Sequence, residues 1–217
     1  MKESQSPCEE LQDTYAEWYQ QRSEDEKRLQ YRAMKCEAAY FKDMSLDILR
    51  KHLAGTAPAA TGTFHEKWLD EVFALTLVKW RYVLNGGLEY RGRCDTHEMM
   101  IEIRPEDKDD DIVLLHEMIH AHEFILSEAS ELYKQHVLLS LYKRLSRKVP
   151  ALIDAVTTDR RLAVDAGHTP LFMLKSFDID LRLEKPLGTV YSRSRNGFPT
   201  GTEAEGITAW ACRGQNP

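Results

Sequence analysis

The chain has 217 residues, 42% of them hydrophobic and 29% charged, a composition that is typical of a globular protein and excludes collagen-like and wholly disordered chains. Lys and Arg number 29 against 35 Asp and Glu, and the resulting net charge of −6 argues against a general nucleic-acid binder, which needs a concentrated basic surface. No window approaches the roughly 18 apolar residues of a membrane span, and the N-terminus shows no apolar core of a signal peptide. We therefore expect an intracellular protein, cytoplasmic or nuclear, with no membrane partner.

The first 55 residues have helical patterning. Residues 6–9 (SPCE) have the order of a helix cap, a first-turn proline and a capping-box glutamate. Apolar residues at helical spacing continue with interruptions to about Leu53. Residues 55–63 are small, uncharged and proline-containing, which is typical of a linker. The sequence thus predicts an N-terminal helical extension over residues 1–55.

The middle of the chain predicts a helix followed by two short strands. The helix is expected from about residue 65 to residue 83, where an Asn-Gly-Gly sequence interrupts the pattern. The strands are expected at residues 88–90 and 99–104, around a turn at residues 92–96. The second strand is rich in β-formers but flanked by charges, which suits a half-exposed or edge strand. We expect an α+β fold that is mostly helical with a short antiparallel sheet.

The rest of the chain predicts helices. Residues 107–111 are acidic, which suits the start of a helix, where negative charge offsets the helix dipole. The tail from residue 192 is rich in Gly, Ser, Thr and Arg and is expected to be flexible. Between them, four helices are predicted at about residues 110–126, 130–147, 150–165 and 170–177.

The predicted helix at residues 110–126 contains the motif HExxH. His116 and His120 are four residues apart, so both imidazoles lie on one helix face and can reach one ion. Glu117 stands beside them and can take a proton from a metal-activated water and pass it to the leaving amine. His-Glu occurs four times in the chain, but only here does a histidine follow three residues after the glutamate. The motif predicts a catalytic Zn²⁺ site rather than two ordinary histidines.

A catalytic zinc usually takes three protein ligands, so one more is needed. His136 lies inside an amphipathic helical pattern, where a lone histidine is more often structural. His168 follows a glycine and precedes Thr-Pro, a junction that can start a helix and direct a side chain at a site. His122, two residues beyond His120, points off the metal face and is expected at the surface or behind the ligands. The downstream candidates are Glu123, Glu128, Glu131, His136 and His168.

Three segments resemble the SprT-like metallopeptidases, the family that includes Spartan. Residues 114–121 (LLHEMIHA) are similar to the metal-binding helix of that family, and residues 86–103 resemble its glycine-containing strand lead-in. Residues 167–172 (GHTPLF) are similar to the G-H-G-P-x-F-like stretch that carries the family's third histidine, with Thr169 in place of the second glycine. Residues 189–191 lie about where the family has a strand.

The resemblance covers roughly residues 68–191 and makes His168 the preferred third ligand. His168 has the flanking pattern but requires an inserted helical segment at about residues 127–165. His136 lies near the family's usual spacing but lacks the pattern, so it stays an alternative, as does an acidic ligand. The resemblance implies a zincin-like metallopeptidase domain over residues 64–191 and leaves residues 192–217 as a tail.

The implied activity is that of a zinc endopeptidase acting on a protein or peptide substrate. Some family members degrade proteins crosslinked to DNA, although the acidic balance adds little independent support for DNA as a partner here. The strand at residues 99–103 could pair with an extended substrate, whereas Tyr191 is given no role. Two rivals remain: an HExxH protease of another family with a glutamate ligand such as Glu131, and a non-catalytic helical module that binds protein or nucleic acid. The oligomeric state is left open.

Overall fold

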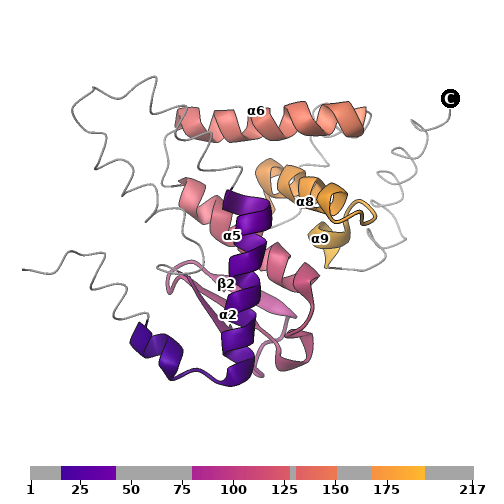
Figure 1. The fold of residues 1–217 in the computed structure, drawn as a ribbon. Helices are drawn as coiled ribbons and strands as arrows, with labels where there is room; N and C mark the ends of the chain where they lie inside the picture. The colour runs from indigo at the N-terminus through magenta and orange to yellow at the C-terminus, as the bar shows by residue number, and fades with distance from the viewer. Residues whose placement is uncertain (1–15, 43–79, 128–130, 151–167, 194–217) are drawn as a thin grey trace, which may run out of the picture. The chain divides into compact units, whose positions relative to one another are not determined.

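The computed structural model describes residues 16–42, 80–127, 131–150 and 168–193 (Figure 1). The chain divides into two compact units, Met1–Ala129 and Ser130–Pro217. The cap at residues 6–9, the linker at 55–63, nearly all of the helix predicted at 150–165 and the tail beyond residue 193 lie outside the described residues. In the described part, the fold is α+β and mostly helical, as predicted, with a small three-stranded sheet.

In the first unit, helix α2 (Glu24–Cys36) continues into a π-helical turn, η1 (Glu37–Lys42). Ser23 caps α2 through a capping box, because its side chain accepts from the backbone N–H of Glu26 and the Glu26 carboxylate accepts from the backbone N–H of Ser23. Leu29 and Ala33 are buried on the inner face. The local sequence therefore fixes both the start of α2 and the face that it packs.

The sheet is mixed rather than antiparallel. Its strands are β1 (Arg81–Leu84), β2 (Gly92–Asp95) and β3 (Met100–Ile103), in the order β1-β3-β2. β1 pairs with β3 in parallel, and β2 pairs with β3 antiparallel. The expectation of a short antiparallel sheet is thus wrong for the β1–β3 pair.

Two predicted boundaries before β3 are also wrong. Residues 65–79 of the helix predicted at 65–83 lie outside the described residues, but its end at residues 81–83 is part of β1, in which Tyr82 and Val83 are buried. Residues 88–90 are not a strand, and the turn expected at residues 92–96 is mostly β2. The turn follows β2, where the Asp95 carboxylate accepts from the backbone N–H groups of His97 and Glu98, at 3.1 Å each. An aspartate that bonds the backbone just ahead of it favours a turn there.

β3 is the central strand, so the prediction of an edge strand at residues 99–104 is wrong. Its charged residue Glu102 is buried because it accepts hydrogen bonds from Asn85 at 2.8 Å and from Arg93 at 2.5 Å. The central position of β3 also contradicts the pairing of this strand with an extended substrate, since both of its edges already bond neighbouring strands.

Helix α2 covers the outer edge of β1. The Gln30 side-chain amide accepts from the backbone N–H of Tyr82 at 3.1 Å and donates to the carbonyl of Trp80 at 3.4 Å. Glu26 accepts from the backbone N–H of Leu84 at 3.2 Å. Side chains of α2 thus supply partners that a further strand would otherwise provide.

Helix α5 (Asp111–Ser127) follows a 3₁₀ turn, η3 (Pro105–Asp107), and packs against β2 and β3. It matches the helix predicted at residues 110–126. Most of its side chains are buried, including Val113, Leu114 and Ile119. The helix that carries HExxH is therefore the core of the first unit.

The second unit contains helices α6 (Glu131–Lys148), α8 (Pro170–Arg182) and α9 (Thr189–Ser192). α6 agrees with the prediction at residues 130–147, and α8 extends past the predicted end at residue 177. The strand expected at residues 189–191 is wrong, because this segment forms the short helix α9 after Gly188, whose φ of 86° suits glycine. Within the described residues, no helix has the length and apolar character to cross a membrane.

Candidate metal centre

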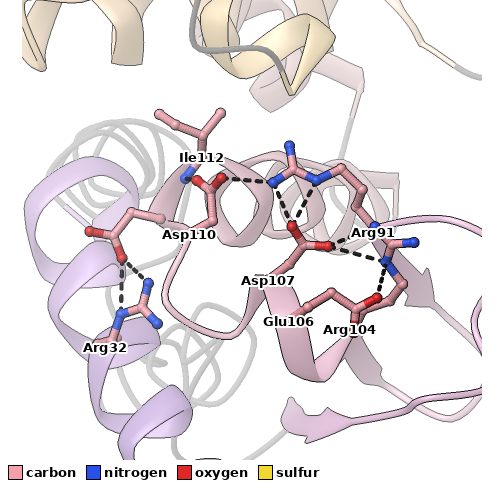
Figure 2. Close-up of polar contacts among 8 residues, drawn as sticks. Arg32, Arg91, Arg104, Glu106, Asp107, Asp110 and Ile112 are labelled. Carbon is pink, nitrogen blue, oxygen red and sulfur yellow. Dashed lines mark hydrogen bonds and ion pairs between the residues drawn. The ribbon is translucent and has the colours of Figure 1, made fainter.

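A network of arginines and aspartates anchors the start of the HExxH helix (Figure 2). Asp107 accepts from Arg91 on one carboxylate oxygen, at 2.5–2.9 Å, and from Arg104 on the other, at 3.0–3.1 Å. Arg91 also reaches Asp110 at 2.8 Å, and Asp110 accepts from the backbone N–H of Ile112 at 3.0 Å. The acidic run predicted at this position is therefore neutralised by arginines from other segments as well as placed at the helix start.

The charge of Asp107 is favoured by this network. Burial alone would raise the pKa of its carboxyl group, but hydrogen bonds and charges from Arg91 and Arg104 outweigh burial and hold that pKa below its ordinary value. The carboxylate is consequently ionised across the neutral range, and α5 begins at a fixed point beside the sheet.

His116 and His120 occupy successive turns of α5. Their ring centroids are 5.1 Å apart, as expected for an i, i+4 pair on one face. His116 is buried and His120 half-buried. The Nδ1 atom of His120 lies 3.8 Å from a carboxylate oxygen of Glu123, and an acidic group on that side favours Nε2 as the metal-binding atom.

Glu117 points into the packing between α5 and β2. The residue is 2% exposed. An ideal Cβ built on Gly92 would lie 2.9 Å from both Cγ and Oε1 of Glu117. The burial of the nearby Cys94 thiol, followed by the charge of Glu117, raises the pKa of Cys94, so this cysteine stays a neutral thiol. The glutamate of the motif thus lies in a tightly packed environment.

His168 stands immediately before α8 in the second unit. Thr169 caps that helix by accepting from the backbone N–H of Phe172 at 3.2 Å, and Pro170 occupies the first turn. The His168 ring stacks on Phe172, with centroids 4.2 Å apart, and tilts against Tyr191 at 4.9 Å. The prediction that this segment opens a helix is confirmed.

The donor atoms of His116, His120 and His168 all lie within 4.8 Å of one another, close enough to hold a metal ion. Three imidazoles are a donor set that suits zinc and other borderline transition metals. The three residues preferred as ligands from the sequence therefore lie close enough together to hold one metal ion.

The other candidates differ in what the structure says of them. His136 and Glu131 lie in α6, but their side chains are not among those described, and Glu128 lies outside the described residues. The surface position considered for His122 is wrong. The residue is 1% exposed and its ring meets that of Phe41 edge-on, with centroids 5.5 Å apart, because α5 is buried on almost every side.

Sequence reasoning missed Gly92 and Glu123. Gly92 was assigned to a turn, although a glycine inside a strand marks a close approach of another group. Glu123 was considered only as a ligand, whereas its position one turn after His120 also suits the orientation of that ring. The sequence signals were the glycine itself for Gly92 and the spacing of three residues from His120 for Glu123.

Comparisons of the chain with protein-family models, with curated proteins and with solved structures give no match.

Proposed function

We propose that the chain is a zinc-dependent endopeptidase of the SprT-like type. The observation that carries the proposal is the mutual proximity of the His116, His120 and His168 donor atoms, together with a glutamate directly after His116 on the same helix. Further support comes from two of the sequence segments that resemble the family, LLHEMIHA and GHTPLF. A zincin-like core in the first unit, with its sheet beside α5, is part of the same proposal.

Different residues of the chain would bind the metal, transfer the proton and orient the ligands during peptide hydrolysis. His116, His120 and His168 would hold Zn²⁺, which supplies a Lewis acid for the scissile carbonyl and lowers the pKa of water towards ~7. Glu117 takes a proton from the attacking water and returns it to the leaving amine. Glu123, whose carboxylate lies 3.8 Å from Nδ1 of His120, would orient that ring, and the ring of His168 packs against Phe172 and Tyr191. The substrate class is protein or peptide, and the family resemblance extends it to proteins bound or crosslinked to DNA.

Substitution of the proposed base tests the activity. Wild type is expected to bind about one zinc per chain and to cleave casein, whereas Glu117→Gln retains the zinc and loses hydrolysis, because an amide cannot accept the proton. Zinc content is measured by inductively coupled plasma mass spectrometry, and cleavage is measured by the release of labelled peptides from casein. His97→Ala is the matched control, since the His97 side chain is 95% exposed.

The same assay distinguishes the rivals. Stimulation of cleavage by single- or double-stranded DNA would support DNA-associated proteins as substrates. Equal cleavage by wild type and Glu117→Gln, or a wild type without metal, would contradict the enzyme proposal and favour a helical module that binds protein or nucleic acid. Loss of zinc in Glu131→Ala with retention in His168→Ala would instead indicate an HExxH protease of another family.

A further inference from the structure

Gly92 lies where strand β2 approaches the proposed base most closely. An ideal Cβ on Gly92 would come within 2.9 Å of Cγ and Oε1 of Glu117 and within 3.1 Å of Cγ1 of Val113, one turn earlier on α5. Separations under 3.0 Å require some atom to move. The backbone conformation at position 92 does not require glycine. Among the described glycines, the positive φ belongs to Gly188 and not to Gly92. What glycine provides at this position is space.

The strand cannot easily yield that space. Gly92 pairs with Ile103 in the β2–β3 ladder, and the backbone N–H of Arg104 donates to the carbonyl of Arg91 at 3.0 Å. The Arg91 side chain is bound to Asp107 and Asp110, which fix the start of α5. The residue just before Gly92 therefore ties β2 to the same segment that positions the helix.

The helix backbone is equally constrained, because Val113 and Leu114 are fully buried. The atoms that can move are at the end of the Glu117 side chain, which is flexible at its outer torsions. A methyl group at position 92 would therefore shift the Glu117 carboxylate before it shifted the backbone that carries His116 and His120.

We propose that Gly92 is a positioning residue for Glu117: the missing side chain leaves the volume in which the carboxylate of the general base keeps its orientation. This inference rests on the proposed hydrolase function. Gly92→Ala is expected to retain zinc and fold while kcat falls about a hundredfold, the size of effect that a misplacement of about 1 Å produces. KM stays unchanged, and the acidic limb of the kcat–pH profile, which reports the base, shifts.

Gly86→Ala is the matched control. An ideal Cβ on Gly86 meets its nearest neighbour, Cγ of Pro105, at 4.0 Å, an ordinary contact. This variant is expected to leave kcat, KM and zinc content at wild-type values. An equal fall in kcat in Gly86→Ala and Gly92→Ala would overturn the proposal, because it would indicate a general loss of fold.

A double-mutant cycle tests the contact without activity. Urea unfolding of metal-free protein is measured for wild type, Gly92→Ala, Glu117→Ala and the double variant. Gly92→Ala is expected to lower the urea midpoint in wild type and to lower it less in the Glu117→Ala background, where Cγ and Oε1 are absent. Equal shifts in both backgrounds would overturn the contact between the two residues.

The two experiments separate the possible failures. Retained kcat in Gly92→Ala, with hydrolysis that still depends on Glu117, would overturn the positioning role and leave the proposed function intact. Wild-type hydrolysis that does not depend on Glu117 would overturn the proposed function and the positioning role with it. In that case the double-mutant cycle in urea still shows whether Gly92 and Glu117 are in contact.

Discussion

Two buried aspartates, one in each compact unit, are held in opposite ways. In the first, Asp107 is bound by Arg91 and Arg104, which outweigh its burial and lower its pKa. In the second, Asp180 on α8 accepts from the backbone N–H groups of Gly188 at 2.7 Å and Val190 at 2.9 Å. Burial outweighs these neutral donors and raises the pKa of Asp180 to about 7.

The comparison shows how the surroundings of an acid decide the pH at which it supports the fold. Guanidinium groups keep Asp107 charged, so the anchor of α5 is complete at neutral pH and weakens in acid. Backbone amides hold Asp180 without supplying a full charge, so its ionisation near neutral pH carries a cost. The helix that carries His116 and His120 therefore begins at a charged carboxylate, whereas the α8–α9 segment is held by a carboxyl group that titrates near neutral pH.

The largest expected effect is on metal affinity, which tests whether His116 and His168 are ligands. His116→Ala and His168→Ala are each expected to weaken zinc binding by more than ~100-fold. Loss of a residue that only orients a ligand weakens metal binding by at most about that factor. His136→Ala and the exposed control His97→Ala are expected to bind zinc like wild type. Affinity is measured by competition with a chromogenic chelator, and urea unfolding confirms that each variant folds.

The ligand series has a clear contrary result. Retained affinity in His168→Ala with a loss in His136→Ala would move the third ligand to α6. Loss in neither variant would leave the third ligand outside both His136 and His168.

Asp180 gives the second effect, on the pH dependence of stability in the second unit. Its folded pKa is raised, so the folded chain holds a proton that the unfolded chain releases. The resulting stabilisation is complete below the ordinary pKa of 3.8 and is lost as pH rises through about 7. The full change is roughly 4 kcal/mol, from about three pKa units at 1.36 kcal/mol each. Hydrogen exchange of the Gly188 and Val190 amides, corrected for intrinsic rates, measures it locally.

Asp180→Asn sharpens this measurement. The amide keeps one acceptor oxygen but does not ionise, so the variant is expected to lose stability at low pH and to lose the slope between pH 4 and pH 8. A slope equal to that of wild type would show that another group, not Asp180, titrates in this range.

The elements that the sequence predicted well are those with strong local signals. Helix α5 has a continuous apolar pattern and an acidic start, and both act within the segment itself. β1 was missed because residues 81–84 follow a helical pattern, while their strand conformation depends on parallel pairing with β3, nineteen positions away in register, as Arg81 opposite Met100 shows. The secondary-structure propensity of a segment carries no information about a pairing partner so distant in sequence.

The candidate site divides in the same way. His116, Glu117 and His120 follow from spacing on one helix, and the helix start after His168 follows from its Thr-Pro sequence. The interpretation of residues 99–104 as an edge strand failed because Glu102 is neutralised by Arg93, on the neighbouring strand, and such a pairing is set by register rather than by local composition. The space at Gly92 depends on two segments meeting, so the sequence showed only a glycine.

The smallest expected effect is on the charged anchor itself. Arg91→Ala removes the hydrogen bonds from Arg91 to Asp107 and Asp110, and we expect a loss of about 1–3 kcal/mol in the free energy of unfolding at neutral pH. Arg28→Ala is the control: Arg28 is 79% exposed and 3.7 Å from Asp25, and an exposed pair contributes about 0–1 kcal/mol. Because the folded pKa of Asp107 is depressed, its contribution is complete above the unfolded pKa and is lost as pH falls through the folded value. Urea unfolding should therefore show wild type and Arg91→Ala converging in acid, and a constant difference between them at every pH would mean that Arg91 stabilises the unit by packing rather than through the charge of Asp107.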